Sequence, residues 1–143
     1  MKKSINKKIL VSIIIPYHKK KKFFPLTIKS IKNQVFKNYE LIVIYDDKDL
    51  KELTFVKNQL KSIKNKNLII NKKIIGPGLS RNIGIKLAKG KYVSFCDADD
   101  IWKKNKLSYQ INFMIKNNLK FSHSNYDIID FMGKRIGNFM IEE

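Results

Sequence analysis

Hydrophobic residues occur along this chain in two patterns that alternate with one another. Apolar runs lie at residues 9–15, which Ser12 alone interrupts, and at 41–45 and 68–70, and a further apolar stretch begins at Tyr92. A nearly unbroken run rich in β-branched residues is typical of a strand that is buried on both faces, as in a parallel sheet. We therefore predict four strands, the first of which ends at Pro16.

Between these runs, apolar residues recur at the spacing of one helix face. Pro25 is expected in a first helical turn, Gly90 at a helix end and Asn105 at an N-cap. The predicted apolar faces comprise Phe24, Ile28, Ile31 and Val35, then Leu53, Val56, Leu60 and Ile63, then Ile83, Leu87 and Ala88, and finally Leu107, Ile111 and Met114. Strands that alternate with helices predict an α/β fold with a mostly parallel sheet and right-handed crossovers.

The last part of the chain continues this pattern less regularly. Residues 121–129 are strand-like, and Met132 and Gly133 are expected to form a turn before residues 134–136. A length of 143 residues suits one domain with its own core, and the sequence contains no internal repeat and no interdomain linker. We therefore predict a single domain over residues 1–143.

Three carboxylates follow the fourth apolar run within four residues, at Asp97, Asp99 and Asp100. In an extended chain alternate side chains share a face, so Asp97 and Asp99 would point at one target. Neighbouring carboxylates repel unless a cation lies between them, and hard oxygen ligands suit Mg²⁺ or Mn²⁺ together with a substrate phosphate. The alternative is that these aspartates only form a turn and cap the next segment.

Other chemically active residue types also follow predicted strands. Pro16, Tyr17 and His18 follow the first strand, and Asp46 and Asp47 follow the second. A glycine-rich segment, residues 76–82, precedes a predicted helix whose first amides could bind an anion. Because ligands bind beyond the carboxyl ends of parallel strands, these segments are expected to converge on one nucleotide and metal site.

The charge balance raises a second possibility. The chain carries 30 Lys and Arg residues against 12 Asp and Glu residues, a formal net charge of +18, so a polyanionic partner must be considered. Only Arg81 and Arg135 are arginines, however, and proteins that read nucleic acid rely on arginine for bidentate contacts. The lysines are spread along the whole chain, including the run at residues 19–22, so we favour a coding bias over nucleic-acid binding.

Cysteine usage and hydropathy bear on location. The lone Cys96 excludes an internal disulfide framework and is compatible with a reducing compartment. No run approaches the roughly 18 apolar residues of a membrane span, and residues 1–8 lack the apolar segment of a secretory signal. We expect a soluble cytoplasmic protein whose lysines attract it to the anionic inner face of the membrane.

Several segments, taken in order, resemble the family 2 inverting glycosyltransferases with the GT-A fold. They are residues 11–16, 34–43, 80–85, 90–95 and 97–100, within a match that runs from about Val11 to Gly133. The resemblance implies a Rossmann-like fold with a nucleotide and metal-binding core at 9–102, and a helix plus the start of the acceptor-side region at 103–143. It also implies transfer of a sugar, with inversion, from a nucleoside-diphosphate sugar to an acceptor hydroxyl in glycan or cell-surface polysaccharide synthesis.

The resemblance assigns roles to individual residues. Asp99 matches the aspartate that binds Mn²⁺ or Mg²⁺, and Asp97 the one that reaches the ribose or a metal-bound water. Arg81 matches an arginine near the diphosphate. Pro16 and His18 lie in the loop that holds the base, with Tyr17 beside them, so either ring could stack on it. Asp46 falls on the aspartate that accepts a hydrogen bond from a uracil imide, which favours a UDP-sugar, whereas Tyr45 and Asp47 depart from the family pattern on either side of it.

The family's catalytic base lies in a second half that this sequence does not contain. Asp127, Asp130, Glu142 and Glu143 are available by type, but none sits in the family's motif for that role. We therefore assign no catalytic base, and expect a glycan or lipid-linked acceptor to be bound by a further domain or a partner chain.

Two other functions remain open, a nucleotide-sugar-binding module that transfers nothing and a nucleic-acid-binding domain. A glycoside hydrolase is disfavoured because its two carboxyl groups must lie about 5 Å or more apart across a sugar.

Overall fold

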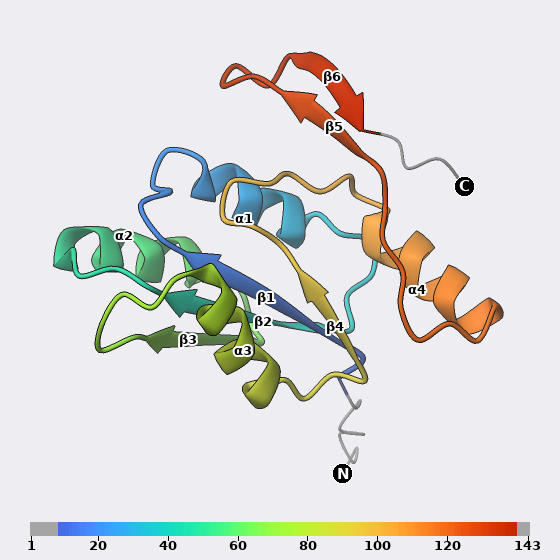
Figure 1. Ribbon diagram of the computed structural model, residues 1–143, viewed down its shortest axis with the longest axis horizontal. Helices are drawn as coiled ribbons and strands as arrows, with labels where there is room; N and C mark the ends of the chain where they lie inside the picture. Colours follow the sequence, from blue (N-terminus) through green and yellow to red (C-terminus); the bar gives the residue numbers. More distant parts are fainter. Residues whose placement is uncertain (1–8, 140–143) are drawn as a thin grey trace, which may run out of the picture. The chain divides into compact units, whose positions relative to one another are not determined.

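The computed structural model describes residues 9–139, which divide into two compact units between Lys106 and Leu107. The first unit is a four-stranded sheet with three helices (Figure 1). The second contains a helix and a two-stranded sheet. The division lies close to the predicted boundary between the core and the acceptor-side region.

The sheet of the first unit is entirely parallel, as the apolar runs predicted. Its strands are β1 (Val11–Tyr17), β2 (Tyr39–Tyr45), β3 (Lys66–Ile70) and β4 (Tyr92–Phe95), in the order β3-β2-β1-β4. The chain builds outward from β1 to β3 and then returns to place β4 on the other side of β1. This reversal puts the topological switch point, where α/β proteins bind ligands, between β1 and β4.

Three helices connect these strands: α1 (Phe24–Lys32), α2 (Leu50–Leu60) and α3 (Pro77–Leu87). Figure 1 shows α1 and α2 on one face of the sheet and α3 on the other. The two central strands are therefore covered on both sides, and nearly every residue of β1 and β2 is buried. This burial explains why their sequences are mostly apolar at successive positions rather than alternating between apolar and polar ones.

Two expectations about element ends are wrong. Pro16 does not end the first strand, which continues to Tyr17. The partner strand β4 ends at Phe95, opposite Ile14, so beyond that point β1 has no neighbour on one side and a proline without an N–H is tolerated. Val35, predicted on a helix face, lies after α1 and is 59 % exposed.

Gly90 was expected to stop α3, but the helix ends at Leu87 and the glycine serves close packing. A Cβ at Gly90 would lie 2.6 Å from the backbone nitrogen of Ser12. The Gly90 amide donates to Ser12 Oγ (2.9 Å), which itself donates to the buried Glu40 Oε1 (2.6 Å). Glu40 Oε1 also accepts from the Lys89 amide (2.7 Å). These hydrogen bonds fix the segment that leads into β4 against Ser12 of β1 and Glu40 of β2.

Replacing Gly90 with alanine is expected to lower the free energy of unfolding by about 2–3 kcal/mol, because the methyl group meets backbone atoms that cannot move aside. The matched control is Gly78→Ala on α3, where a Cβ meets nothing within 4 Å. That variant should be neutral or more stable by up to about 1 kcal/mol. Urea unfolding followed by circular dichroism measures both, and equal midpoints for the two variants would contradict the packing argument.

The second unit consists of α4 (Lys106–Lys116), which begins at the last residue of the first unit, and the antiparallel pair β5 (Tyr126–Ile129) and β6 (Arg135–Phe139). The predicted turn is confirmed, with Gly133 at φ 82° and the Asp130 side chain accepting from the amides of Met132 and Lys134 (both 2.9 Å). The strand predicted over residues 121–129 is shorter in the structure, where β5 spans only Tyr126–Ile129. Among the described helices, not one has the length and apolar content of a membrane span.

Candidate functional site

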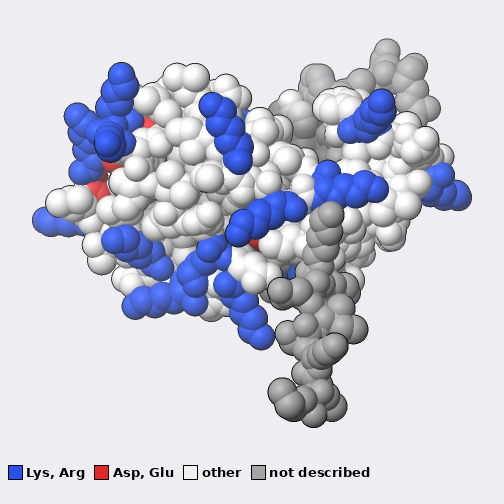
Figure 2. Space-filling model, turned by 90° about the horizontal axis from the view of Figure 1, so that it is seen from below, with Lys and Arg blue, Asp and Glu red and all other residues white. Residues whose placement is uncertain are grey.

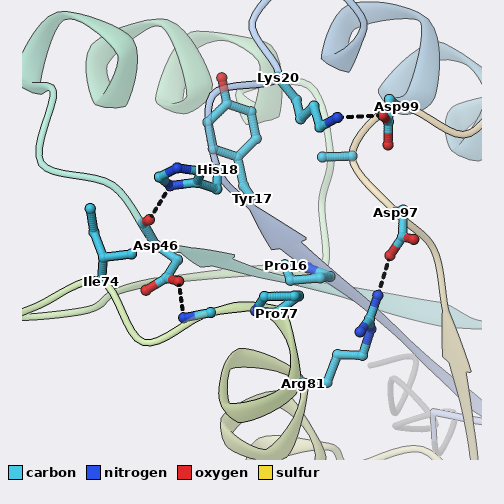
Figure 3. Close-up of a pocket in the computed structure, with 12 residues that line it drawn as sticks. Pro16, Tyr17, His18, Lys20, Asp46, Ile74, Pro77, Arg81, Asp97 and Asp99 are labelled. Atoms are coloured by element: carbon cyan, nitrogen blue, oxygen red, sulfur yellow. Dashed lines mark hydrogen bonds and ion pairs between the residues drawn. The ribbon is translucent and has the colours of Figure 1, made fainter.

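A pocket of about 540 Å³ lies in the first unit at the carboxyl ends of the strands (Figure 3). Its walls come from the loops that follow β1, β2 and β4 and from the start of α3. Every site residue predicted from the sequence lines it, namely Pro16, Tyr17, His18, Asp46, Arg81, Asp97 and Asp99. The predicted convergence of these segments is therefore observed.

Asp97 and Asp99 lie after β4 in a turn, so the strand alternation used to pair them does not apply. Each carboxylate is instead held by a cation from a different segment. Lys20 Nζ lies 2.7 Å from Asp99 Oδ2, and the Arg81 guanidinium donates to Asp97 Oδ1 (Figure 3). Around the acidic turn the pocket thus pairs two carboxylates with two cations, an arrangement that can bind both a metal ion and phosphate groups.

The acidic turn is anchored from behind. Thr27 of α1 donates to the Ala98 carbonyl (3.0 Å), and the Asp100 amide donates to the Asp97 carbonyl (3.1 Å). Asp100 does not line the pocket; burial, followed by the charges of Asp97 and Asp99, raises its pKa. The turn therefore presents two of its three carboxylates, those of Asp97 and Asp99, to the pocket.

His18 lies at the pocket wall with 43 % of its side chain exposed. Its Nδ1 is 2.7 Å from the Asp46 carbonyl oxygen and 3.6 Å from Asp47 Oδ2. Because a carbonyl oxygen only accepts, Nδ1 must carry the hydrogen, and Nε2 is the ring nitrogen that can accept from a ligand. The buried Oδ2 of Asp47 has no hydrogen-bond partner among the described residues.

The Tyr17 ring is packed inside the protein, although the residue is part of the pocket wall. The residue is fully buried, with its ring edge-on to Phe24 (4.8 Å between centroids) and stacked on Tyr45 (5.5 Å). Its hydroxyl donates to Glu52 Oε1 (2.7 Å), and burial, followed by this carboxylate, raises its pKa. Of the two rings that could stack on a base, only His18 is exposed to do so.

Asp46 is only 2 % exposed, and its carboxylate is already engaged by the protein. It accepts from the amides of Ile75 (3.0 Å) and Gly76 (2.7 Å) and from the side chain of Asn71 (2.8 Å). Burial alone would raise its pKa, but these hydrogen bonds outweigh burial and lower it. Asp46 therefore fixes the loop that leads into α3, and its contact with a uracil imide stays a prediction that would require some of these bonds to be exchanged.

The residues present fit a metal ion that is completed by its substrate. In the described part of the chain, His, Cys, Asp and Glu side chains form no group of three or more that could hold a metal alone. Asp97 and Asp99 supply two carboxylates, which is the number Mg²⁺ or Mn²⁺ usually takes from protein when phosphate oxygens and waters complete the shell. A metal held here would thus depend on a bound diphosphate.

The described carboxylates considered as a catalytic base, Asp127 and Asp130, belong to the second unit. Asp127 pairs with Arg135 (3.1 Å), and Asp130 closes the hairpin turn. Glu142 and Glu143 lie outside the described residues.

Sequence reasoning missed Lys20, because the lysine run at 19–22 is uniform and marks no member of it. What distinguishes Lys20 appears in the backbone: the preceding residue, Lys19, has a left-handed conformation with φ 49°, and Lys20 lines the pocket.

The fold and the pocket define an α/β domain with an acidic turn at the switch point of its parallel sheet. The family model of glycosyl transferase family 2 matches residues 12–139, and the chain belongs to this family. It is 38 % identical over 125 residues to the Escherichia coli protein WfgD, a UDP-Glc:alpha-D-GlcNAc-diphosphoundecaprenol beta-1,3-glucosyltransferase, and 39 % identical over 138 residues to a glycosyltransferase of Rickettsia conorii. These matches cover 85 % and 95 % of this chain but only 47 % and 22 % of those proteins.

Solved structures agree with this assignment. The Staphylococcus aureus protein TarS, residues 1–349 in complex with UDP, matches with a TM-score of 0.70 and 26 % identity, over 76 % of this chain and 33 % of that one. The mannosyltransferase PcManGT of Pyrobaculum calidifontis, solved with GDP-Man and Mn²⁺, matches in fold with a TM-score of 0.67 and 17 % identity, over 73 % of this chain and 32 % of that one. The predicted GT-A fold is confirmed.

Proposed function

We propose that this chain is the donor-binding portion of a metal-dependent, inverting glycosyltransferase that uses a UDP-sugar. The observation that carries the proposal is the pocket at the β1/β4 switch point, where Asp97, Asp99, Arg81 and Lys20 meet. Two relatives support the choice of nucleotide, since WfgD is named for UDP-Glc and TarS was solved with UDP. His18, whose ring is exposed at the pocket wall, adds a group that can stack on the uracil base.

Each side chain has a distinct part in this proposal. Asp99 and Asp97 hold the divalent ion, which when bound neutralises charge on the departing diphosphate as a Lewis acid. Arg81 provides a planar cation for phosphate oxygens, and His18 and the loop fixed by Asp46 hold the base. The acceptor is proposed to be a glycan or a lipid-linked sugar, as the name of WfgD states for that protein, and to be bound outside these residues.

Titration calorimetry with UDP, in Mn²⁺ and in EDTA, tests the proposal directly. UDP is expected to bind in Mn²⁺ and at least about tenfold more weakly in EDTA, because EDTA removes the metal ion that would link the two carboxylates to the phosphate oxygens. A binding site that prefers uracil should also discriminate against GDP. Equal affinities in Mn²⁺ and EDTA would contradict the metal-dependent site.

The type of cation does not favour the nucleic-acid alternative. Figure 2 shows Lys and Arg side chains over much of one face, several of them next to one another, but of the 30 such residues only Arg81 and Arg135 are arginines, the residue that reads bases through bidentate contacts. Nucleic-acid binding would appear as affinity for DNA that falls steeply with salt and survives loss of Asp99.

A further inference from the structure

Lys20 is the pocket cation to which nothing in the family comparison or the motifs gives a role. We propose that Lys20 is a diphosphate-binding residue held on Asp99 until a donor enters, at which point Asp99 exchanges the ammonium group for a divalent ion. This inference rests on the proposed function. It describes how Asp99 passes from its ion pair with Lys20 to its contact with a metal ion when a donor binds.

The geometry places Lys20 where both partners can be reached. Its ammonium group contacts Asp99 at 2.7 Å, and Figure 3 shows it extending across the pocket toward the acidic turn. Arg81 reaches Asp97 from the opposite side, out of α3. A diphosphate bound to a metal ion on these carboxylates would therefore lie between two cations that come from different loops.

The backbone at Lys19 explains how one lysine of four is selected. Its φ of 49° is unfavourable for a residue with a side chain, and such conformations are retained where the surroundings or a function require them. On one side of this residue His18 turns toward Asp46, and on the other Lys20 turns toward Asp99. The strained residue thus directs its two neighbours to the base and diphosphate ends of the pocket.

Exposure indicates that the Lys20–Asp99 pair can be exchanged. The side chains of Lys20 and Asp99 are 42 % and 35 % exposed, and ion pairs in contact with water contribute little to stability. Asp46, by contrast, is 2 % exposed and tied by several hydrogen bonds, so it cannot move as freely. Lysine also suits exchange because its compact charge sits on a flexible stem and has no fixed fork geometry.

The test is UDP binding by the Lys20→Gln variant, measured by calorimetry in EDTA and in Mn²⁺. In EDTA the variant should bind UDP about tenfold more weakly than the wild type, because a charged contact to phosphate is lost. The ratio of affinity in Mn²⁺ to affinity in EDTA should rise by several-fold, since the metal ion no longer competes with an ammonium group for Asp99. A merely structural lysine would leave this ratio unchanged.

Two controls match the change. Lys21→Gln removes the same charge one residue away, where the ammonium group lies over the Phe55 ring (5.5 Å) outside the pocket, and should bind UDP as the wild type does. Lys20→Arg keeps the charge and should retain most of the affinity in EDTA. An unaltered affinity of Lys20→Gln in EDTA, or an unaltered ratio, overturns the inference while leaving the proposed function standing. A wild-type chain that binds no UDP overturns both.

Discussion

The Asp99→Asn variant is expected to lose the Mn²⁺-dependent part of UDP binding, with a fall in affinity of at least about 100-fold in Mn²⁺. Asparagine keeps the shape of aspartate but lacks the negative charge that a hard divalent cation requires. Residues that only support a metal ligand typically cost 10–100-fold in metal affinity when changed, so a direct ligand should cost at least as much. Calorimetry in Mn²⁺ and in EDTA measures the effect.

The fold should survive this substitution, because the Asp99 side chain is 35 % exposed and its ion pair is with the similarly exposed side chain of Lys20. The unfolding free energy is therefore expected to change by no more than about 0.5 kcal/mol. Asp100→Asn is the matched control, because it removes a carboxylate from the same turn that does not line the pocket. Equal losses in the two variants would show that the net charge of the turn, and not a ligand position, governs binding.

The topology was predictable because it depends on the hydrophobic pattern of whole segments and not on the contacts of single side chains. The apolar runs of β1 and β2 indicated burial on both faces, and their alternation with helices indicated a parallel sheet. Once the sheet is parallel, the ends of its strands lie at one edge, so the convergence of His18, Asp46 and Asp97 followed without any knowledge of contacts.

Individual side-chain partners were not predictable in this way. Asp97 and Asp99 were paired by strand alternation, but the strand ends at Phe95 and the turn after it has no fixed period. A glycine after an apolar helix face, such as Gly90, is typical of a helix end. Its role in close packing is visible only in the structure, where the Ser12 backbone, distant in sequence, lies against it. Lys20 is chosen from four consecutive lysines by a single backbone angle at Lys19, which no composition rule specifies.

Asp46 has two suggested roles: its place in the sequence suggests contact with the base, and its hydrogen bonds suggest that it fixes the loop into α3. Substitutions can separate these roles. Asp46→Ala is expected to lower the free energy of unfolding by about 3 kcal/mol. It leaves the amides of Ile75 and Gly76 and the side chain of Asn71 without their acceptor, and unsatisfied buried donors cost about 1–3 kcal/mol each without adding fully. Asp46→Asn, which retains one acceptor oxygen, should fall between the wild type and Asp46→Ala. Urea unfolding at pH 7 gives the values.

The same contacts predict a pH dependence. Hydrogen bonds lower the pKa of Asp46 in the folded state below the value of about 3.9 that an unfolded aspartate has. Folding is therefore stabilised by the ionised carboxylate at all pH values above about 4, and this contribution is lost as the pH falls through the lower, folded-state pKa. The difference in stability between the wild type and Asp46→Asn should accordingly be constant from about pH 5 to 7 and shrink below about pH 4.

Binding then decides between the two roles. If Asp46 only fixes the loop into α3, Asp46→Asn should weaken UDP and GDP binding by similar factors, because the loop positions Arg81 and the start of α3 for any diphosphate. If Asp46 also accepts from a uracil imide, the loss should be larger for UDP, because an asparagine that turns its amide toward the imide faces donor with donor. Stability equal to the wild type, together with a selective loss of UDP binding, would assign Asp46 to base recognition and remove its structural role.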